Sequence, residues 1–177
     1  MPTPEFITEL RALVGTRPLW LSCAVAVVLD PDGTRVLLGR RTDSGQWALP
    51  GGIIDPGEQP ADAVVRECFE ETGVVARPEA LTSVTVSETV VYANGDRTQY
   101  LELTFRCRAV AGEARVNDEE STEVRWFDLT DLPPLDAPNR RRLTLALSHQ
   151  GPAAYDFSGL PTVLGHASNE TLGPPAR

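Results

Sequence analysis

The chain has 177 residues, of which 41% are hydrophobic, and its formal net charge is −9 at pH 7. This length and composition predict one globular domain with short additions at its ends. The negative charge disfavours a passive nucleic-acid-binding surface, which needs basic patches. It does not exclude a phosphorylated substrate whose charge is bridged by metal ions.

No segment of the sequence predicts export or membrane insertion. The N-terminal residues lack the basic and apolar regions of a signal peptide, and the longest apolar stretch, Leu19–Leu29, is too short to cross a bilayer. The three cysteines, Cys23, Cys68 and Cys107, are far apart and lie in apolar patterns. They predict buried free thiols in a reducing compartment, and we expect a cytoplasmic protein.

The first predicted element is a short amphipathic helix over residues 4–14, where apolar residues recur at helical spacing before Gly15. We assign residues 1–16 to this element, residues 17–150 to the main domain, and residues 151–177 to a C-terminal extension. The sequence leaves open whether the N-terminal helix covers an edge of the sheet or joins a homodimer interface.

The next segments predict two strands of a central sheet. Residues 23–29 form a continuous apolar run, which is typical of a strand buried on both faces. Residues 30–33 predict a turn, and residues 36–38 predict the returning strand. Arg40 and Arg41 follow it, and they are equally consistent with binding of substrate phosphates and with plain surface charge.

A glycine-rich loop and a helix come next. Residues 50–58 contain three glycines and two prolines and predict a loop. Pro60 suits the first turn of a helix, no Gly or Pro occurs in residues 61–72, and Gly73 suits a left-handed cap. This predicts a helix of about three turns.

Two surfaces are expected on this helix. The face that should pack on the sheet consists of Ala61, Val64, Val65, Cys68 and Phe69. An adjoining acidic edge consists of Glu67, Glu70 and Glu71, with Arg66 beside Glu70. Carboxylates at this spacing repel one another unless a positive charge lies between them. A hard divalent cation such as Mg²⁺, which prefers oxygen ligands, would remove that repulsion.

The spacing Gly52-x5-Glu58-x7-Arg66-Glu67-Cys68-x-Glu70-Glu71-x-Gly73-Val74 resembles the Nudix box, the signature of the Nudix hydrolase superfamily. Cys68 departs from the aliphatic residue usual at its position, but a buried thiol behaves as a small hydrophobe. The resemblance implies an α/β fold, with a mixed β-sheet in an α/β/α sandwich.

The resemblance also implies roles for individual residues. Glu67 and Glu71 are the expected metal ligands, with Glu70 as a ligand or base and the Gly51 carbonyl as a further ligand. Arg66 is expected to orient the carboxylates, and Glu58 to tie the loop to the helix. The acidic segment at residues 117–123 offers Glu120 as one more metal-binding or basic residue, with Glu119 and Glu123 as rivals. The expected cofactor is Mg²⁺, with Mn²⁺ as an alternative.

The last predicted elements are a β-hairpin and a helix. Residues 83–92 and 98–110 are β-prone and flank Asn94-Gly95, a strong hairpin signal; before them, Arg77-Pro78 is expected to break the chain. Tyr92 lies at the distance beyond the box where the family's diadenosine polyphosphate enzymes often have a tyrosine, although cross-strand packing would also explain it. Residues 139–150 predict the final helix.

The resemblance implies hydrolysis of a phosphoanhydride bond in a nucleoside diphosphate linked to a further group X, a class that includes nucleoside triphosphates and dinucleoside polyphosphates. The expected partner is a small nucleotide substrate. A non-catalytic Nudix domain that senses a ligand is the alternative. An isomerase of the isopentenyl diphosphate type would need histidine ligands, but His149 and His166 lie far from the box.

Overall fold

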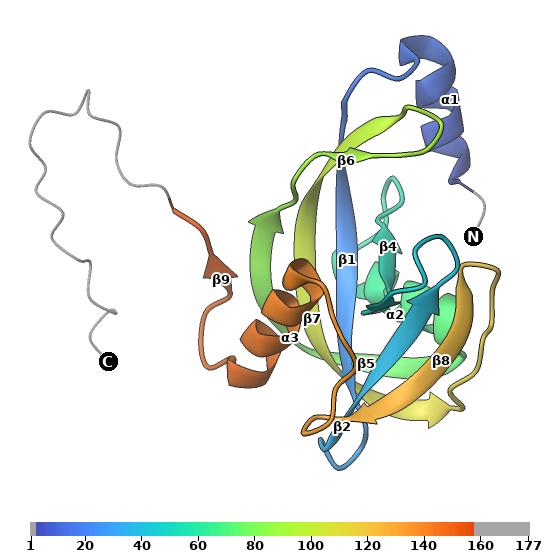
Figure 1. The fold of residues 1–177 in the computed structure, drawn as a ribbon. Helices are drawn as coiled ribbons and strands as arrows, with labels where there is room; N and C mark the ends of the chain where they lie inside the picture. The colour runs from blue at the N-terminus through green and yellow to red at the C-terminus, as the bar shows by residue number, and fades with distance from the viewer. Residues whose placement is uncertain (1–2, 158–177) are drawn as a thin grey trace, which may run out of the picture.

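The structure is a computed structural model that describes residues 3–157, in which helices pack on one mixed sheet (Figure 1). The helices are α1 (Glu5–Val14), α2 (Pro60–Thr72) and α3 (Ala137–Ser148). The strands are β1 (Leu19–Leu29), β2 (Arg35–Arg41), β3 (Trp47–Ala48), β4 (Gly51–Ile53), β5 (Val74–Val86), β6 (Val90–Val91), β7 (Arg97–Gly112), β8 (Ser121–Asp128) and β9 (Ala154–Tyr155).

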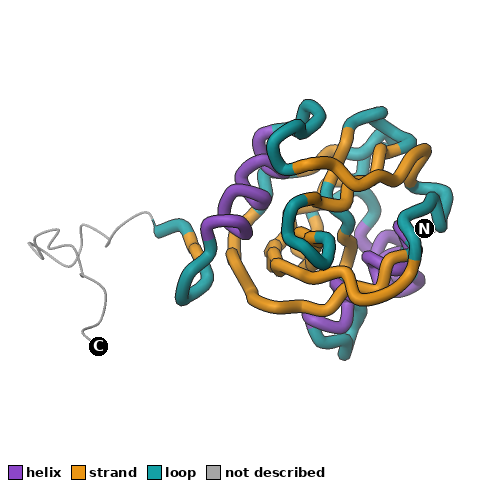
Figure 2. The backbone as a smooth tube through the Cα atoms, turned by 90° about the horizontal axis from the view of Figure 1, so that it is seen from below, coloured by secondary structure: helices purple, strands orange, loops and turns teal. Residues whose placement is uncertain are grey.

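The strand order is β3-β2-β1-β7-β5-β9, with β4 paired to β1, β6 to β7 and β8 to β2. The central pair, β1 and β7, is parallel along its length, from Leu19 opposite Thr98 to Leu29 opposite Arg108. The pairs of β1 with β2 and of β5 with β7 are antiparallel. The sheet is therefore mixed, as predicted. Figure 2 shows the strands curving through the middle of the molecule, with the helices outside them.

Strand β1 divides the interior into two cores. Ala24, Ala26 and Val28 belong to the core that contains Val64 and Cys68 of α2. The alternate residues, Val25, Val27 and Leu29, belong to the core that contains Leu143 and Ala146 of α3. Successive side chains of a strand point to opposite faces, so α2 and α3 cover opposite faces of the sheet. The predicted α/β/α arrangement is confirmed.

Helix α2 has the predicted limits. It begins at Pro60, and Gly73 ends it in the left-handed conformation (φ 70°, ψ 4°), with its N–H donating to Phe69 O at 2.8 Å. The predicted orientation is wrong in part: Phe69 is 44% exposed, while Glu67 and Glu71 are buried. The helix is thus rotated so that two carboxylates face inward, toward the glycine-rich loop.

The hairpin is confirmed, and the expected break at Arg77-Pro78 is wrong. Val90 lies opposite Thr98 in the β6–β7 hairpin, and Tyr92 N–H donates to Asp96 O across the turn at 2.9 Å. Arg77 and Pro78 lie inside β5, where a register shift between Pro78 and Ala80 interrupts the pairing with β7. Such an irregularity lets a strand carry a residue that has no N–H to donate.

The final helix begins at Ala137, two residues earlier than predicted, because the Asp136 carboxylate caps it by accepting from Asn139 N–H at 2.7 Å. Beyond it, β9 pairs with β5 in parallel. His166 and residues 158–177 of the C-terminal extension lie outside the described residues. The division at residues 16 and 150 stays a prediction.

The three cysteines are free thiols; Cys68 and Cys107 are buried, but Cys23 is only half-buried, so the prediction of burial is wrong there. No helix within residues 3–157 is both long and apolar enough to cross a membrane.

Candidate active site

A cavity of about 690 Å³ lies between the loop before α2, α1, the β6–β7 hairpin and the start of α3. Glu67, Glu71 and Glu120 line one side of it, together with Gly51 and Gly52. Residues that are separate in the sequence, in the Nudix box and in the acidic segment before β8, therefore meet at one cavity. Glu70 is not among the lining residues.

Arg66 holds the acidic residues of α2 in place. Its Nε and Nη2 donate to the two carboxylate oxygens of Glu58, each at 2.8 Å. Its Nη1 donates to Glu67 Oε1 at 2.8 Å and to Glu70 Oε2 at 3.0 Å, and its Nη2 also contacts Ile53 O at 3.2 Å. One guanidinium thus orients three carboxylates, which is the arrangement the sequence predicts for Arg66.

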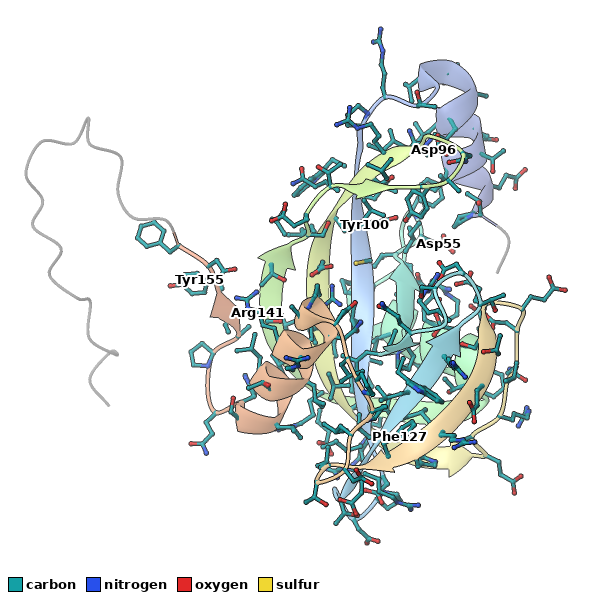
Figure 3. The ribbon with its side chains drawn as sticks, in the orientation of Figure 1. Asp55, Asp96, Tyr100, Phe127, Arg141 and Tyr155 are labelled. Atoms are coloured by element: carbon teal, nitrogen blue, oxygen red, sulfur yellow. The ribbon has the colours of Figure 1, made fainter. Side chains whose placement is uncertain are left out.

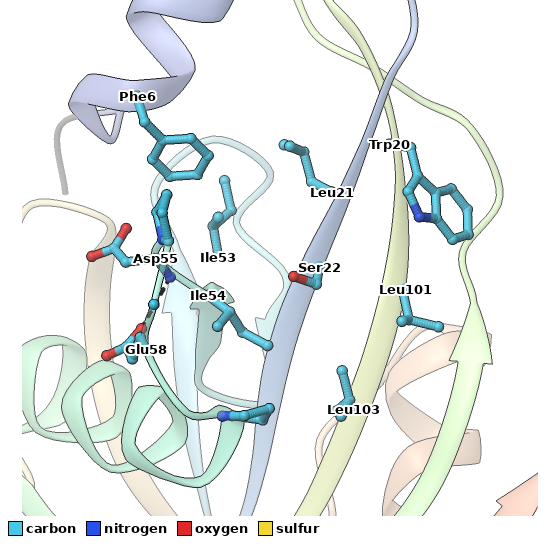
Figure 4. Close-up of a pocket in the computed structure, with 13 residues that line it drawn as sticks. Phe6, Trp20, Leu21, Ser22, Ile53, Ile54, Asp55, Glu58, Leu101 and Leu103 are labelled. Atoms are coloured by element: carbon cyan, nitrogen blue, oxygen red, sulfur yellow. Dashed lines mark hydrogen bonds between the residues drawn. The ribbon is translucent and has the colours of Figure 1, made fainter.

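Glu58 joins the loop to the helix. Besides its two bonds from Arg66, it accepts from Asp55 N–H at 3.1 Å, the bond drawn in Figure 4. The Arg66 guanidinium lowers the pKa of the Glu58 carboxyl. This geometry agrees with a structural role for Glu58.

Burial makes the two inward carboxylates costly to ionise. It raises the pKa of Glu67 to about 7, in spite of the opposing hydrogen bond from Arg66. Burial also raises the pKa of Glu71 well above its ordinary value, and the charges of Glu67, Glu120 and Asp118 raise it further, against a weak bond of 3.5 Å from Gly51 N–H. A cation bound next to Glu67 and Glu71 would stabilise their ionised forms and lower both pKa values.

The carboxylate oxygens are ligands of the kind that Mg²⁺ and Mn²⁺ prefer, so the donor set fits a hard divalent ion. Within residues 3–157, no three His, Cys, Asp or Glu side chains already converge as a finished coordination shell. Glu67 Oε1 instead accepts from Arg66. Metal binding would therefore require these carboxylates to move closer together.

Glu120 is the member of the acidic segment that faces α2. Its charge contributes to the raised pKa values of both Glu67 and Glu71, and its Oε2 lies 3.8 Å from Arg41 Nη1. Glu119 is exposed, and Glu123 forms ion pairs with Arg125 and, at 4.0 Å, with Arg40. The geometry favours Glu120 over its two rivals, but its role stays a prediction.

Two of the three candidate substrate-binding residues line the cavity, and the third does not. Arg41 lines the cavity, where it pairs with Asp43 at 2.9 Å as well as with Glu120. Arg40 is not among the lining residues, and its Nε donates to Gly45 O at 2.9 Å. Tyr92 lines the cavity on the hairpin side, with its hydroxyl 2.6 Å from that of Tyr100. These geometries favour Arg41 and Tyr92 over Arg40.

The sequence analysis missed Arg11, Glu102 and Arg142, which also line the cavity. Glu102 and Arg142 form a largely buried ion pair, with side-chain exposures of 11% and 16%. A charged residue between Leu101 and Leu103 in a β-prone segment was a usable signal, because carboxylates are almost never buried without a partner. Arg11 had no such signal, since its partners lie on a distant hairpin.

The fold and this cavity define an α/β domain in which an acidic helix borders a cavity. A model of the NUDIX domain matches residues 21–147. A "MutT-like protein" of Streptomyces ambofaciens is 35% identical over 81% of this chain and 88% of its own length. An ADP-ribose pyrophosphatase of Methanocaldococcus jannaschii is 34% identical over 66% of this chain and 69% of its own.

Among solved structures, an ADP-ribose pyrophosphatase from Streptococcus suis superposes with a TM-score of 0.60, at 25% identity, over 77% of this chain and 98% of that one. The chain therefore belongs to the Nudix family, and it is a hydrolase that acts on acid anhydrides. Nudix hydrolases generally use divalent metal ions.

Proposed function

We propose that the protein hydrolyses a phosphoanhydride bond in a nucleoside diphosphate linked to a further group X, with Mg²⁺ or Mn²⁺ held by Glu67, Glu71 and Glu120. The observation that carries this proposal is that Glu67, Glu71 and Glu120, from two distant segments, line the same cavity, where the charges of Glu67 and Glu120 act on Glu71. The cavity volume of about 690 Å³ falls within the range that nucleotide-sized ligands use.

The roles of the individual residues follow from their positions. The Gly51 backbone carbonyl would complete the set of oxygen ligands. Arg66 orients Glu67 at the cavity and also holds Glu70, which is not among the lining residues. Arg41, at the cavity, would neutralise a phosphate oxygen. Glu70 and Glu120 are the candidates to accept the proton of the attacking water. A bound divalent ion would neutralise charge on the phosphates and lower the pKa of a bound water.

The candidate substrates are ADP-ribose, nucleoside triphosphates and dinucleoside polyphosphates, in which X is a ribose, a phosphate or a nucleotide. ADP-ribose is the first compound to test, because two similar proteins are named for it. The free thiols Cys68 and Cys107 support action in a reducing compartment such as the cytoplasm.

The decisive comparison is Glu71→Gln against Glu119→Gln, each treated with EDTA and returned to Mg²⁺. Glu71→Gln removes a charge from a buried residue at the cavity, whereas Glu119→Gln removes one from an exposed neighbour of Glu120. We expect Glu71→Gln to lower kcat at least about 100-fold with the fold intact, and Glu119→Gln to change it little. Unchanged turnover of Glu71→Gln would refute the proposal.

A further inference from the structure

Helix α1 lies beside the cavity, between the glycine-rich loop and the β6–β7 hairpin. Pro4, Ile7 and Arg11 line the cavity that contains the acidic residues. Phe6 lines a second hollow of about 620 Å³ and lies above Asp55 and next to Ile53, as Figure 4 shows. The helix thus borders both the loop that precedes α2 and the side of the cavity formed by the hairpin.

Apolar packing alone holds this helix weakly. Ile7 is its one buried residue, and Leu13 is 84% exposed. A helix of ten residues is marginal in water without tertiary contacts. Its position must therefore depend on polar contacts as well.

Arg11 supplies those contacts through four hydrogen bonds and one ion pair of its guanidinium. Nη1 donates to Gly15 O at 3.1 Å and to Arg17 O at 2.6 Å, beyond the end of α1. Nη2 donates to Arg97 O at 2.9 Å and to Thr98 Oγ1 at 3.0 Å, and Nε lies 3.4 Å from Asp96 Oδ2. The last three acceptors belong to the hairpin; Figure 3 shows Asp96 next to α1.

The Arg11 side chain is only 13% exposed. A guanidinium that makes four hydrogen bonds and one ion pair in this fork is a fixed connection, which a lysine cannot reproduce. Because both of its Nη atoms are engaged by the protein, we assign Arg11 no direct contact with a ligand. It can affect a ligand only through the segments that it holds.

Those segments carry another part of the cavity lining. Tyr92 and Asn94 of the hairpin and Tyr100 of β7 line it there. The hydroxyls of Tyr92 and Tyr100 are 2.6 Å apart, so one donates to the other and one proton remains for a ligand. Neutral hydroxyl and amide groups of this kind suit the hydroxyls of a sugar.

We propose that α1 is a wall of the substrate cavity and that Arg11 is a positioning residue, which fixes the hairpin against α1 so that the cavity accepts a sugar-bearing group X. This inference rests on the proposed function, since it assigns the end of the cavity beyond the diphosphate. The chemistry at α2 does not pass through Arg11. Loss of the contacts between Arg11 and the hairpin should therefore weaken substrate binding without slowing hydrolysis of the bound substrate.

The test compares wild-type protein with Arg11→Ala, Arg11→Lys and Thr98→Val, using ADP-ribose and ATP as substrates. We expect Arg11→Ala to raise the KM for ADP-ribose about 10-fold or more, with kcat changed by less than about 3-fold and a smaller effect on the KM for ATP. Arg11→Lys should fall between wild type and Arg11→Ala. Thr98→Val, which removes one acceptor and keeps the shape, should raise KM in the same direction.

Glu9→Ala, at an exposed position of the same helix, is the matched control and should leave both constants unchanged. Hydrogen exchange at residues 90–98 gives a readout without substrate, and Arg11→Ala should accelerate it. An unchanged KM, or a fall in kcat as large as the rise in KM, would overturn the inference while leaving the Glu71 result intact. If wild-type protein neither binds nor hydrolyses ADP-ribose, the sugar assignment is wrong, and the proposed function is then decided by the Glu71 comparison on other nucleotides.

Discussion

The carboxylate of Glu67 packs directly against the backbone of Gly52. A Cβ atom at position 52 would lie within 2.5 Å of the carboxyl carbon and both oxygens of Glu67. No side chain fits there while Glu67 keeps its buried position. The second glycine of the loop is therefore a steric requirement of the acidic helix rather than only a source of backbone flexibility.

Replacing Gly52 with alanine should displace Glu67. We expect Gly52→Ala to lower the hydrolysis rate at least about 10-fold, since a ligand misplaced by about 1 Å is enough for such a loss. It should also lower the free energy of unfolding by roughly 1–3 kcal/mol through overpacking. Both are measured on purified variants by steady-state kinetics and urea unfolding.

A double-variant comparison identifies the cause of that stability loss. In a Glu67→Ala background the clash is gone, so Gly52→Ala should cost clearly less stability than it does in wild-type protein. Equal costs in the two backgrounds would mean that Glu67 is not what position 52 contacts.

The local signals in the sequence were sufficient for much of the fold. Pro60 and Gly73 delimit α2 in the sequence and in the structure, and Asn94-Gly95 marks the turn of the hairpin. These features depend on neighbouring residues alone. The grouping of Arg66 with Glu58 and Glu70 was also predictable, because the family motif fixes their spacing.

The errors concern contacts made over long distances in the chain. Phe69 was expected to be buried because it shares a predicted helix face with Val64 and Cys68, but Glu67 and Glu71 are buried instead and Phe69 is 44% exposed. The connection from Arg11 to Asp96 joins residues 85 positions apart in the sequence. No periodicity or motif encodes such a contact, so the cavity wall was not predictable.

Of the three acidic residues considered as a further metal ligand, Glu119, Glu120 and Glu123, only Glu120 lines the cavity. We expect Glu120→Gln to raise the Mg²⁺ concentration needed for half-maximal activity about 10-fold, because its carboxylate faces Glu67 and Glu71. Glu119→Gln and Glu123→Gln should leave the Mg²⁺ dependence unchanged, since one is exposed and the other pairs with Arg125. A larger shift for either of them than for Glu120→Gln would reverse the assignment.

Removing one partner of the Glu102–Arg142 ion pair should strongly lower the free energy of unfolding. Arg142→Met leaves Glu102 buried with Thr85 Oγ1, at 3.3 Å, as a remaining neutral partner. We expect it to lower the free energy of unfolding by roughly 3 kcal/mol, and the double variant Glu102→Gln with Arg142→Met to be more stable than Arg142→Met alone.

Arg141→Met is the matched control for this pair. Arg141, labelled in Figure 3, precedes Arg142 on α3, and its partner Asp156 is 73% exposed. An exposed pair contributes about 1 kcal/mol at most. Similar losses for Arg141→Met and Arg142→Met in urea unfolding would show that the buried position of Glu102 carries no special cost.

Asp30 should make the stability of the β1–β2 turn depend on pH. Burial alone would raise its pKa, but hydrogen bonds from the N–H groups of Arg35 and Thr34 and from the Arg35 guanidinium lower it to about 2. Since the folded pKa lies below the ordinary value of 3.8, the stabilisation is complete above about pH 4 and is lost as the pH falls toward 2.

Asp30→Ala should therefore lower the free energy of unfolding by about 2 kcal/mol at pH 7. Its deficit relative to wild type should shrink between pH 4 and pH 2 in urea unfolding. Asp32→Ala, in the same turn but exposed, should show no such change; a deficit for Asp30→Ala that is constant with pH would mean that the ionised carboxylate is not what stabilises the turn.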